Sequence, residues 1–481
     1  MNKRTILYIL GWVLFVEGLA MQTAAFVGVW YREDNFRYFL YTGLAMIAVG
    51  LVIIIKKPKK FFMQRRDGFA ATALAWIVLS FGGALPLWLS GSIPSFTDAV
   101  FESISGFTTT GATILNDIEA LDNCMLFWRA LSHFLGGMGV IVFLLALIPK
   151  LGGNAGINLM KAESTGPDVD KSIPKLRSYA MLLYGIYIGL TVIEAVLLMF
   201  GGMYFFDAVT TAFSTAGTGG FACYNASMAY FNSYYLQGVV SVFMLLFGVN
   251  FYVYILILTR KIKQILKLEE LWIYLGIIAF STLTITINIV NMCSSTFDAF
   301  HRSFFYVNSI MSSTGFAIED TNVWPSYSKA LIVLLTCIGA CAGSTGGGFK
   351  VSRVLILLKE ARKEFRIIVH PHTVQYVKVS GKKLTHEVTR NVSVYLIIYI
   401  VFVFVSTILI SLNGFDFTTN LTSVLATLNN TGPGFAIVGS AGNYSGFNIF
   451  SKIVFCFNMI AGRLELYPLL LIFMPSAWRK N

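Results

Sequence analysis

The chain has 481 residues and a formal net charge of +12; 56% of its residues are hydrophobic and only 12% are charged. Soluble domains carry roughly 25% charged residues. This composition, with a mean hydropathy of +0.70, therefore argues against a soluble globular protein and indicates a membrane protein. Length alone would suggest about three domains, but the closely spaced apolar runs predict one continuous helical bundle. The six cysteines have no metal-ligand spacing, and we interpret them as free thiols or small buried residues.

The N-terminal part of the chain predicts a two-helix membrane hairpin. The apolar run 6–30 is longer than the core of a signal peptide and has no obvious cleavage site, so we interpret it as an uncleaved span. A second span is expected over 39–55. The segment 56–66 contains six Lys and Arg residues, and this basic cluster marks the cytoplasmic side of the membrane.

Four units follow, and each is predicted to contain a long span, a half-length helix with a polar loop, and a second long span. The expected spans are 69–89 and 126–148, 179–200 and 236–258, 271–290 and 330–358, and 392–412 and 453–474. The prediction is thus an all-α polytopic membrane protein, with ten transmembrane helices and four re-entrant segments around one central pore. We divide the chain into the hairpin, 1–66, and pore repeats one to four, 67–151, 152–267, 268–362 and 363–481.

The distribution of basic residues supports this topology. An even number of predicted crossings separates the basic cluster from the linkers 150–177, 260–267 and 359–390, and all three linkers are rich in Lys and Arg. Both termini are expected on the same, cytoplasmic side. Orientation in a lipid membrane explains most of the positive charge, so nucleic-acid binding is not needed to explain it. The long linkers 150–177 and 359–390 are also a natural docking surface for a regulatory partner, although topology alone could account for their charge.

A Thr-Gly pair recurs once in each unit, behind an aromatic residue and an aspartate. The aspartates Asp98, Asp207, Asp298 and Asp416 precede the paired glycine by 13, 12, 17 and 16 residues. A helix of that length rises roughly 18–25 Å, which is less than the core of a bilayer. We therefore expect a half-spanning helix, capped by the aspartate, that ends in a polar loop. Exposed backbone at this depth is tolerated only inside protein or beside water, so four such loops can ring one axis.

These loops have the chemistry of a cation filter. Backbone carbonyls, supplemented by Thr and Ser hydroxyls, can replace the hydration shell of an ion, and Gly allows the backbone angles that turn carbonyls toward an axis. The negative ends of the half-helices would favour a cation, and the missing ring of carboxylates favours a monovalent one. The alternative is an ordinary helix-ending turn, which fits one copy better than four. The predicted ligands are Thr109, Thr110, Gly111, Gly217, Thr218, Gly219, Ser313, Thr314, Gly315, Asn430, Thr431 and Gly432.

Several motifs resemble those of the Trk/Ktr/HKT potassium transporters, and the resemblance runs through all four units. They are Thr109-Thr110-Gly111-Ala112, Asn430-Thr431-Gly432-Pro433-Gly434, Phe127-Trp128-Arg129, Gly136-Gly137-Met138-Gly139, Gly248-Val249-Asn250-Phe251, Cys341–Gly348 and Gly462-Arg463-Leu464-Glu465. The N-terminal hairpin is similar to the TrkH-like branch of this family. Glycine at all four filter positions resembles the potassium-selective members.

The resemblance implies an inner-membrane homodimer that takes up the potassium ion as its transported substrate. It also implies a cytoplasmic nucleotide-binding ring of the TrkA type as the regulatory partner. No organic cofactor is expected in this chain.

Two features are expected to form a gate below the filter. The stretch 339–348 has five glycines in ten residues. Because each Gly costs roughly 1 kcal/mol against Ala in a helix, the last span of unit three should unwind there. We interpret Gly343, Ser344, Thr345, Gly346 and Gly347 as a flexible plug, with close helix packing as the alternative. Arg463 lies inside the last span, where a charge normally faces a cavity or a partner. We interpret it as a cationic barrier, with an interhelical salt bridge as the alternative.

No catalytic triad, metal motif or nucleotide-binding loop is evident, so an enzyme is not expected; the run 343–348 lacks the Gly-Lys-Ser/Thr ending of a phosphate loop. The leading functional prediction is a gated, potassium-selective pore for uptake. The first alternative is a sodium- or proton-coupled potassium symporter of the same fold. A receptor or scaffold that transports nothing would leave the four polar loops unexplained.

Overall fold

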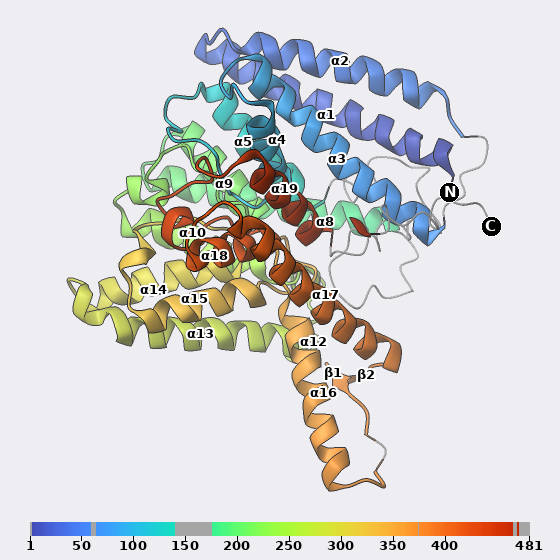
Figure 1. The fold of residues 1–481 in the computed structure, drawn as a ribbon, viewed down its shortest axis with the longest axis vertical. Coiled ribbons are helices and arrows are strands. Elements are labelled where there is room, and N and C mark those ends of the chain that lie inside the picture. The colour runs from blue at the N-terminus through green and yellow to red at the C-terminus, as the bar shows by residue number, and fades with distance from the viewer. Residues whose placement is uncertain (1, 59–63, 140–175, 374, 465–468, 471–481) are drawn as a thin grey trace.

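The N-terminal hairpin is formed by two long antiparallel helices, α1 (Lys3–Tyr31) and α2 (Phe36–Ile55). The computed structural model describes residues 2–58, 64–139, 176–373, 375–464 and 469–470 (Figure 1). Small residues let the two backbones approach closely: a β-carbon on Gly18 would lie 2.6 Å from the Gly43 carbonyl oxygen, and one on Gly50 would lie 2.7 Å from that of Gly11. The hairpin packs through α1 on α3 and α5 of the first repeat.

Each of the four repeats contains a long helix, a short helix and a second helix. The helices are α3 (Arg65–Leu89), α4 (Phe96–Phe107) and α5 (Asn123–Gly137); α8 (Leu176–Phe200), α9 (Phe205–Gly217), α10 (Tyr234–Gly248) and α11 (Tyr252–Leu258); α12 (Ile262–Ile265), α13 (Glu269–Ile289), α14 (Thr296–Met311), α15 (Ser326–Ile338) and α16 (Val351–Val369); and α17 (His386–Ser411), α18 (Phe417–Leu428) and α19 (Ile449–Arg463). Within the described residues, four single turns of 3-10 helix lie among them, η2 (Ser227–Tyr230), η3 (Val290–Met292), η4 (Thr321–Val323) and η5 (Ala436–Val438).

The repeats are arranged in a closed cycle. The second helix of each repeat packs against the short helix of the next repeat: α5 on α9, α10 on α14, and α15 on α18. The last repeat closes the cycle because α19 packs against α4. The ends of the four short helices are therefore brought together in the interior of the bundle, where most of the side chains of these helices are buried.

Six helices within the described residues are long and apolar enough to cross a membrane, or seven if the bent pair of α10 and α11 is one span. They are the two hairpin helices and the first helix of each repeat. Of the ten spans expected from the sequence, the second spans of the four repeats are not continuous helices within the described residues. The α10–α11 pair bends by 97°, α15 ends at Ile338 and α19 ends at Arg463. The expected parts 140–148, 465–468 and 471–474 lie outside the described residues.

Glycine explains where these second helices stop and how closely they approach the short helices. Gly339, which follows α15, has a positive φ of 71° that a helix cannot continue. A β-carbon on Gly136 of α5 would overlap the carbonyl oxygen of Phe107, at the end of α4. One on Gly462 of α19 would likewise overlap the carbonyl oxygen of Leu428, at the end of α18. The breaks are therefore sites where backbone meets backbone.

The caps of the short helices differ from the expected pattern. Ser95 and Ser295 are the N-caps of α4 and α14, and their hydroxyls accept hydrogen bonds from the Asp98 and Asp298 amides at 3.4 and 3.1 Å. Asp416 is an N-cap as expected and accepts from the Thr419 amide at 3.1 Å. The expectation that aspartate caps every short helix was thus wrong for the other repeats. The three remaining aspartates lie in the first turn, where their charge still complements the helix dipole.

A basic projection leaves the bundle after the third repeat. Figure 1 shows α16 extending away from the other helices, followed by a two-stranded hairpin of β1 (Lys378–Val379) and β2 (Lys382–Lys383). The strands are antiparallel, with Lys378 opposite Lys383. The expected linker 359–390 is therefore structured over much of its length: it contains the end of α16, the hairpin and the start of α17. The other expected linker, 150–177, lies almost wholly outside the described residues.

Candidate functional site

The four short helices end in loops of the same shape, which we name the first to fourth Thr-Gly loops: 108–111, 217–220, 312–315 and 429–432. In each, one residue takes the left-handed conformation, with φ of 55° at Thr109, 55° at Thr218, 62° at Ser313 and 53° at Asn430. The amide of the next residue bonds to the carbonyl five residues earlier, as in a Schellman motif; this bond is 2.9 Å from Thr110 to Ser105. A left-handed residue other than Gly costs about 1–2 kcal/mol, so fourfold repetition points to function.

The last glycine of each loop touches the next loop. Gly111, Gly220, Gly315 and Gly432 have positive φ of 77°, 77°, 83° and 86°. A β-carbon on Gly111 would overlap the carbonyl oxygen of Gly219, and one on Gly220 would overlap that of Thr314. In the same way Gly315 meets the carbonyl of Thr431, and Gly432 meets that of Thr110. The four loops therefore form a closed ring in the order of the sequence, with carbonyl oxygens at every junction.

The carbonyl oxygens of this ring have unused lone pairs. Within the described residues, no backbone amide donates to the carbonyl oxygens of Thr110, Gly219, Thr314 and Thr431. Buried carbonyls are nearly always paired, so four that lack a backbone donor at a single place can serve as ligands. Nearby hydroxyls are tied to one another: the hydroxyls of Thr108 and Thr110 lie 2.8 Å apart.

The ring is also cross-linked between repeats. The Asn430 side-chain amide donates to the hydroxyl of Thr110 at 2.9 Å and to the carbonyl of Met459 at 2.9 Å. Ser312 and Thr314 repeat the hydroxyl pair of the first loop at 2.7 Å. These bonds limit how far the loops can move, and so hold the carbonyl oxygens at fixed separations.

All twelve residues predicted as ligands lie in or directly beside this ring, but the register of the second loop is one residue further on. Gly217 is the last residue of α9 and corresponds to Thr108. The glycine in register with Gly111 is Gly220, which the Thr-Gly pattern left out. A Gly-Phe pair in both the second and third loops, Gly220-Phe221 and Gly315-Phe316, was the signal that could have found it.

A buried ion pair fastens the first two loops, and neither partner was predicted to do so. Glu102 of α4 and Arg129 of α5 lie 2.9 Å apart with side chains 0% and 2% exposed. The Glu102 carboxylate also accepts from the amide of Ile114, behind the first loop, at 3.1 Å. Arg129 donates to the carbonyl of Ala222 at 3.2 Å and packs 4.1 Å from the centre of the Phe221 ring, behind the second loop. The pair thus joins two repeats around the ring.

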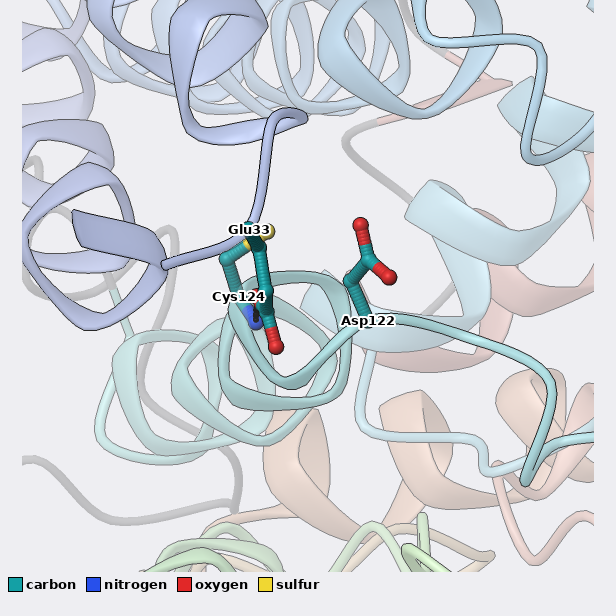
Figure 2. Close-up of side chains that lie close together, drawn as sticks. All are labelled: Glu33, Asp122 and Cys124. Atoms are coloured by element: carbon teal, nitrogen blue, oxygen red, sulfur yellow. Dashed lines mark hydrogen bonds between the residues drawn. The ribbon is translucent and has the colours of Figure 1, made fainter. Parts of the chain in front are cut away.

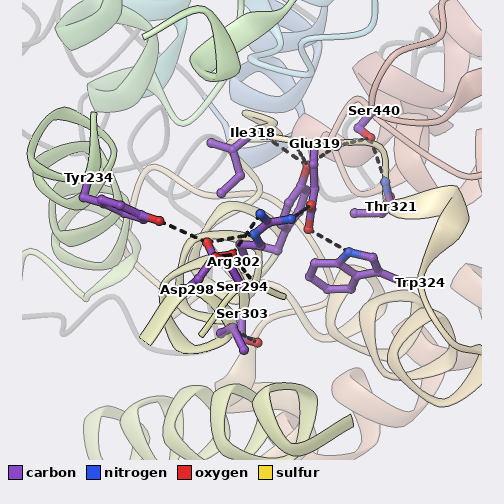
Figure 3. A network of polar contacts seen from close by, with 12 residues as sticks. Tyr234, Ser294, Asp298, Arg302, Ser303, Ile318, Glu319, Thr321, Trp324 and Ser440 are labelled. Carbon is purple, nitrogen blue, oxygen red and sulfur yellow. Dashed lines mark hydrogen bonds and ion pairs between the residues drawn. The ribbon is translucent and has the colours of Figure 1, made fainter. Parts of the chain in front are cut away.

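A second polar network fastens the segments that follow the third and fourth loops (Figure 3). The Tyr306 hydroxyl accepts from the amides of Ile318 and Glu319 at 3.1 and 2.8 Å, behind the third loop. Arg302 pairs with both Asp298, at 2.9 Å, and Glu319. Ser440 of the fourth repeat donates to the Glu319 carbonyl at 2.9 Å. The segments that follow the third and fourth loops are therefore tied together.

The Gly-rich segment between α15 and α16 lies directly against the ring. The Gly347 amide donates to the Ser313 hydroxyl at 2.5 Å, and a β-carbon on Gly346 would lie 2.6 Å from the Ser312 carbonyl oxygen. The Arg463 guanidinium donates to the Thr345 carbonyl at 2.9 Å and to the carbonyls of Gly136 and Gly137 at 2.5 and 2.6 Å. The structure thus brings Arg463 and the Gly-rich segment into contact.

The start of the Gly-rich segment is held by the break between α10 and α11. The Cys341 amide donates to the Gly248 carbonyl at 3.1 Å, and the Phe251 amide donates to the Gly343 carbonyl at 3.0 Å. A carboxylate oxygen of Glu270, at the start of α13, accepts from the Ala342 amide at 2.6 Å. The sequence did not predict these contacts, because they join residues far apart in the chain.

One cluster has the composition of a metal site but another role. Glu33, Asp122 and Cys124 lie close together, with one possible ligand atom from each within 4.8 Å of the others (Figure 2). Both oxygens of Glu33 are already used, since they accept from the amides of Asn123 and Cys124 at 2.7 and 2.9 Å. Glu33 therefore caps the first turn of α5, which explains the cluster without a metal.

Removing one partner of the Glu102–Arg129 pair should be far more damaging than removing both. Glu102→Leu or Arg129→Leu leaves a buried charge uncompensated, which costs about 3–5 kcal/mol of stability; the double variant should recover most of that loss. Thermal unfolding of the purified protein in detergent measures the difference. Arg37→Leu, which breaks the exposed Arg37–Asp34 pair, is the control and should leave the midpoint unchanged. Equal midpoints for wild type and both single variants would contradict the assignment.

Comparisons with known proteins agree over the whole chain. The TrkH family model, described as a cation transport protein, matches residues 36–480. The Trk system potassium uptake protein TrkH of Salmonella typhimurium is 35% identical over 100% of both chains. The Trk system potassium uptake protein TrkG of Escherichia coli is 33% identical over 99% of both chains. The crystal structure of the potassium transporter TrkH from Vibrio parahaemolyticus matches with a TM-score of 0.89 and 32% identity over 100% of both chains.

The relatives are transport proteins, and the six long apolar helices fit a chain that crosses the membrane several times. The chain belongs to the TrkH family of cation transport proteins, and it is a multi-pass membrane transporter rather than an enzyme.

Proposed function

We propose that this chain is the membrane subunit of a potassium uptake system and that the ring of Thr-Gly loops is its selectivity filter. The observation that carries the proposal is the closed ring of glycines and carbonyl oxygens, none of which accepts a backbone hydrogen bond within the described residues. Neutral oxygens in such a ring can replace the water around a monovalent cation. The names of the relatives, which are potassium uptake proteins, support potassium as that cation.

The surrounding structure supports selection of a cation. The four short helices end at the ring, so the negative ends of their dipoles lie beside it. No Asp or Glu belongs to the four loops, and neutral ligands of this kind suit a monovalent ion better than a divalent one. The bonds from Asn430 and the Glu102–Arg129 pair brace the ring. A braced ring keeps its oxygens at distances suited to one ion size.

The gate of this transporter, in our proposal, is the Gly-rich segment together with Arg463. The segment lies against the ring and leads into α16. The Arg463 guanidinium donates a hydrogen bond to the Thr345 carbonyl of this segment. Two unit charges at about 4 Å and an effective dielectric near 20 repel by roughly 4 kcal/mol, which would slow passage of a cation by nearly three decades. The segment has no regular structure, so it can move aside by breaking separate hydrogen bonds rather than by unwinding a helix.

We further propose the setting in which the transporter works. The chain would lie in a bacterial inner membrane as a homodimer, with both termini and the basic projection of α16 and β1–β2 in the cytoplasm. The excess of Lys and Arg in 56–66 and 359–390 supports this orientation. The projection would be the docking surface for a cytoplasmic nucleotide-binding ring. Because α16 begins directly after the Gly-rich segment, a pull on the projection could withdraw the plug.

Growth on limiting potassium tests the proposed function. Expression of the chain in a bacterial strain without potassium uptake should restore growth, and sodium should not substitute. Gly220→Ser should abolish the rescue or its selectivity, because the added side chain would displace the Thr314 carbonyl. Gly276→Ser is the matched control, since a β-carbon there meets no atom within 4 Å. No rescue by a protein that is present in the membrane would contradict the proposal.

Arg463→Ala should raise potassium flux into liposomes in the absence of any partner, by up to nearly three decades if the charge is the whole barrier. Arg463→Lys keeps the charge and is the control. A short deletion within 343–347 should have the same effect as Arg463→Ala. Flux that needs a sodium or proton gradient would favour the symporter instead. If both variants fold and conduct no faster than wild type, the gate lies elsewhere.

Charge reversal of the projection should weaken binding of the regulatory ring. Lys382→Glu with Lys383→Glu changes four units of charge on one exposed strand, and exposed charges act over about 10 Å at 0.1 M salt. Co-purification with the ring subunit should fall, and the deficit should be largest at low salt. The control is Arg37→Glu, because Arg37 is an exposed residue at the start of α2. Unchanged binding at every salt concentration would leave these lysines a role in topology only.

A further inference from the structure

The second Thr-Gly loop lacks side chains that the other three loops have. The first loop carries Thr108 and Thr110, the third Ser312 and Thr314, and the fourth Asn429 and Thr431. At the two corresponding positions the second loop has Gly217 and Gly219. In the first and third loops these side chains hydrogen-bond to each other at 2.8 and 2.7 Å. The second loop must be held by something else.

His133 of α5 occupies the space that these side chains leave. A β-carbon on Gly217 would overlap the backbone carbonyl of His133, and one on Gly219 would overlap the imidazole ring itself. His133 is fully buried, at 0% exposed. The imidazole therefore fits where the second loop has glycine, and the carbonyl of Gly219 beside it is one of the four that contact the last glycine of the preceding loop.

The imidazole is fixed on its other sides. Its Nδ1 lies 2.7 Å from the carbonyl oxygen of Gly106 in the last turn of α4, so Nδ1 carries the proton and donates it. Its ring stacks on Phe221, with centroids 4.2 Å apart and an interplanar angle of 27°. The guanidinium of Arg129 covers Phe221 at 4.1 Å. One histidine thus spans the end of the first short helix, the second loop and the residue behind that loop.

We propose that His133 is a specificity-determining positioning residue of the filter. It replaces the hydroxyl pair that the second loop lacks and sets where the Gly219 carbonyl stands relative to the first loop. The inference rests on the proposed potassium function. Without the imidazole the second loop would have room to relax, and a ring that can shrink accepts a smaller cation. His133 should therefore control discrimination against sodium more than the rate of potassium passage.

Reversal potentials with potassium on one side of a planar bilayer and sodium on the other provide the test. His133→Phe keeps an aromatic ring but loses the bond to Gly106, and the loss of about one hydrogen bond should lower the potassium-to-sodium permeability ratio roughly fivefold. His133→Ala should lower it further. His301→Phe, at a histidine in the first half of α14 and away from the loops, is the matched control and should keep the wild-type ratio.

A swap of side chains separates positioning from general stability. Gly219→Thr alone should impair the protein, because its side chain would meet the imidazole. Gly219→Thr combined with His133→Ala restores the side chain that the other loops have, and its permeability ratio should exceed that of either single variant. Should His133→Ala fail to fold, His133→Phe and the double variant still decide the matter.

Wild-type ratios in folded His133→Phe, or a double variant no better than the single ones, would overturn the inference while leaving the proposed function intact. A wild-type protein that does not discriminate potassium from sodium would overturn the proposed function itself.

Discussion

The contact between the last glycine of each Thr-Gly loop and a backbone carbonyl of the next loop is the constraint on which the rest of this structure depends. It recurs at Gly111, Gly220, Gly315 and Gly432, and each contact leaves no room for a β-carbon. The same four residues need a positive φ, so the position excludes other side chains for two separate reasons. Closing this ring requires four short helices that end at one point, and four second helices that stop or bend to make room for them. Fold and site are therefore consequences of one packing requirement.

The ring of Thr-Gly loops is held more firmly than the Gly-rich segment that lies against it. The ring is braced by a buried ion pair, by the Tyr306 network and by the bonds of Asn430. The Gly-rich segment is held by single hydrogen bonds to several neighbours, among them Gly248, Glu270 and Arg463. A neutral bond of this kind contributes about 0.5–1.5 kcal/mol net and one to a charged group about 1.5–3 kcal/mol, so the segment can be released one bond at a time. A rigid ring above a releasable segment separates selection of the ion from control of its passage.

The sequence predicted those features that local pattern determines. The hairpin, the first long helix of every repeat, the short helices and the unwound stretch near 339–348 follow from apolar runs and glycine content. The second spans of the repeats are not continuous helices within the described residues, because backbone packs on backbone near their breaks and ends, as at Gly136 and Phe107, and such contacts join residues that are distant in the sequence. The same limit hid the role of Glu270. Both features depend on which segments meet in space.

Within the site, the sequence identified the loops but not their exact register. The second loop was assigned through Gly219, because the Thr-Gly pair is the visible pattern, whereas the geometry aligns Gly220 with the other glycines. His133 had no sequence signal, since its partners Gly106 and Gly219 belong to two different repeats. Nothing in the sequence indicated that Glu102 pairs with Arg129. Their contact depends on how α4 packs on α5 within the first repeat.

Direct observation of a bound ion tests the central claim most sharply. Rubidium or thallium, as electron-dense substitutes for potassium, can be introduced into crystals of the full chain and located by anomalous scattering. The account predicts a peak on the axis of the ring, bounded by the carbonyl oxygens of Thr110, Gly219, Thr314 and Thr431. A peak elsewhere in the bundle, with none between these four oxygens, would contradict it.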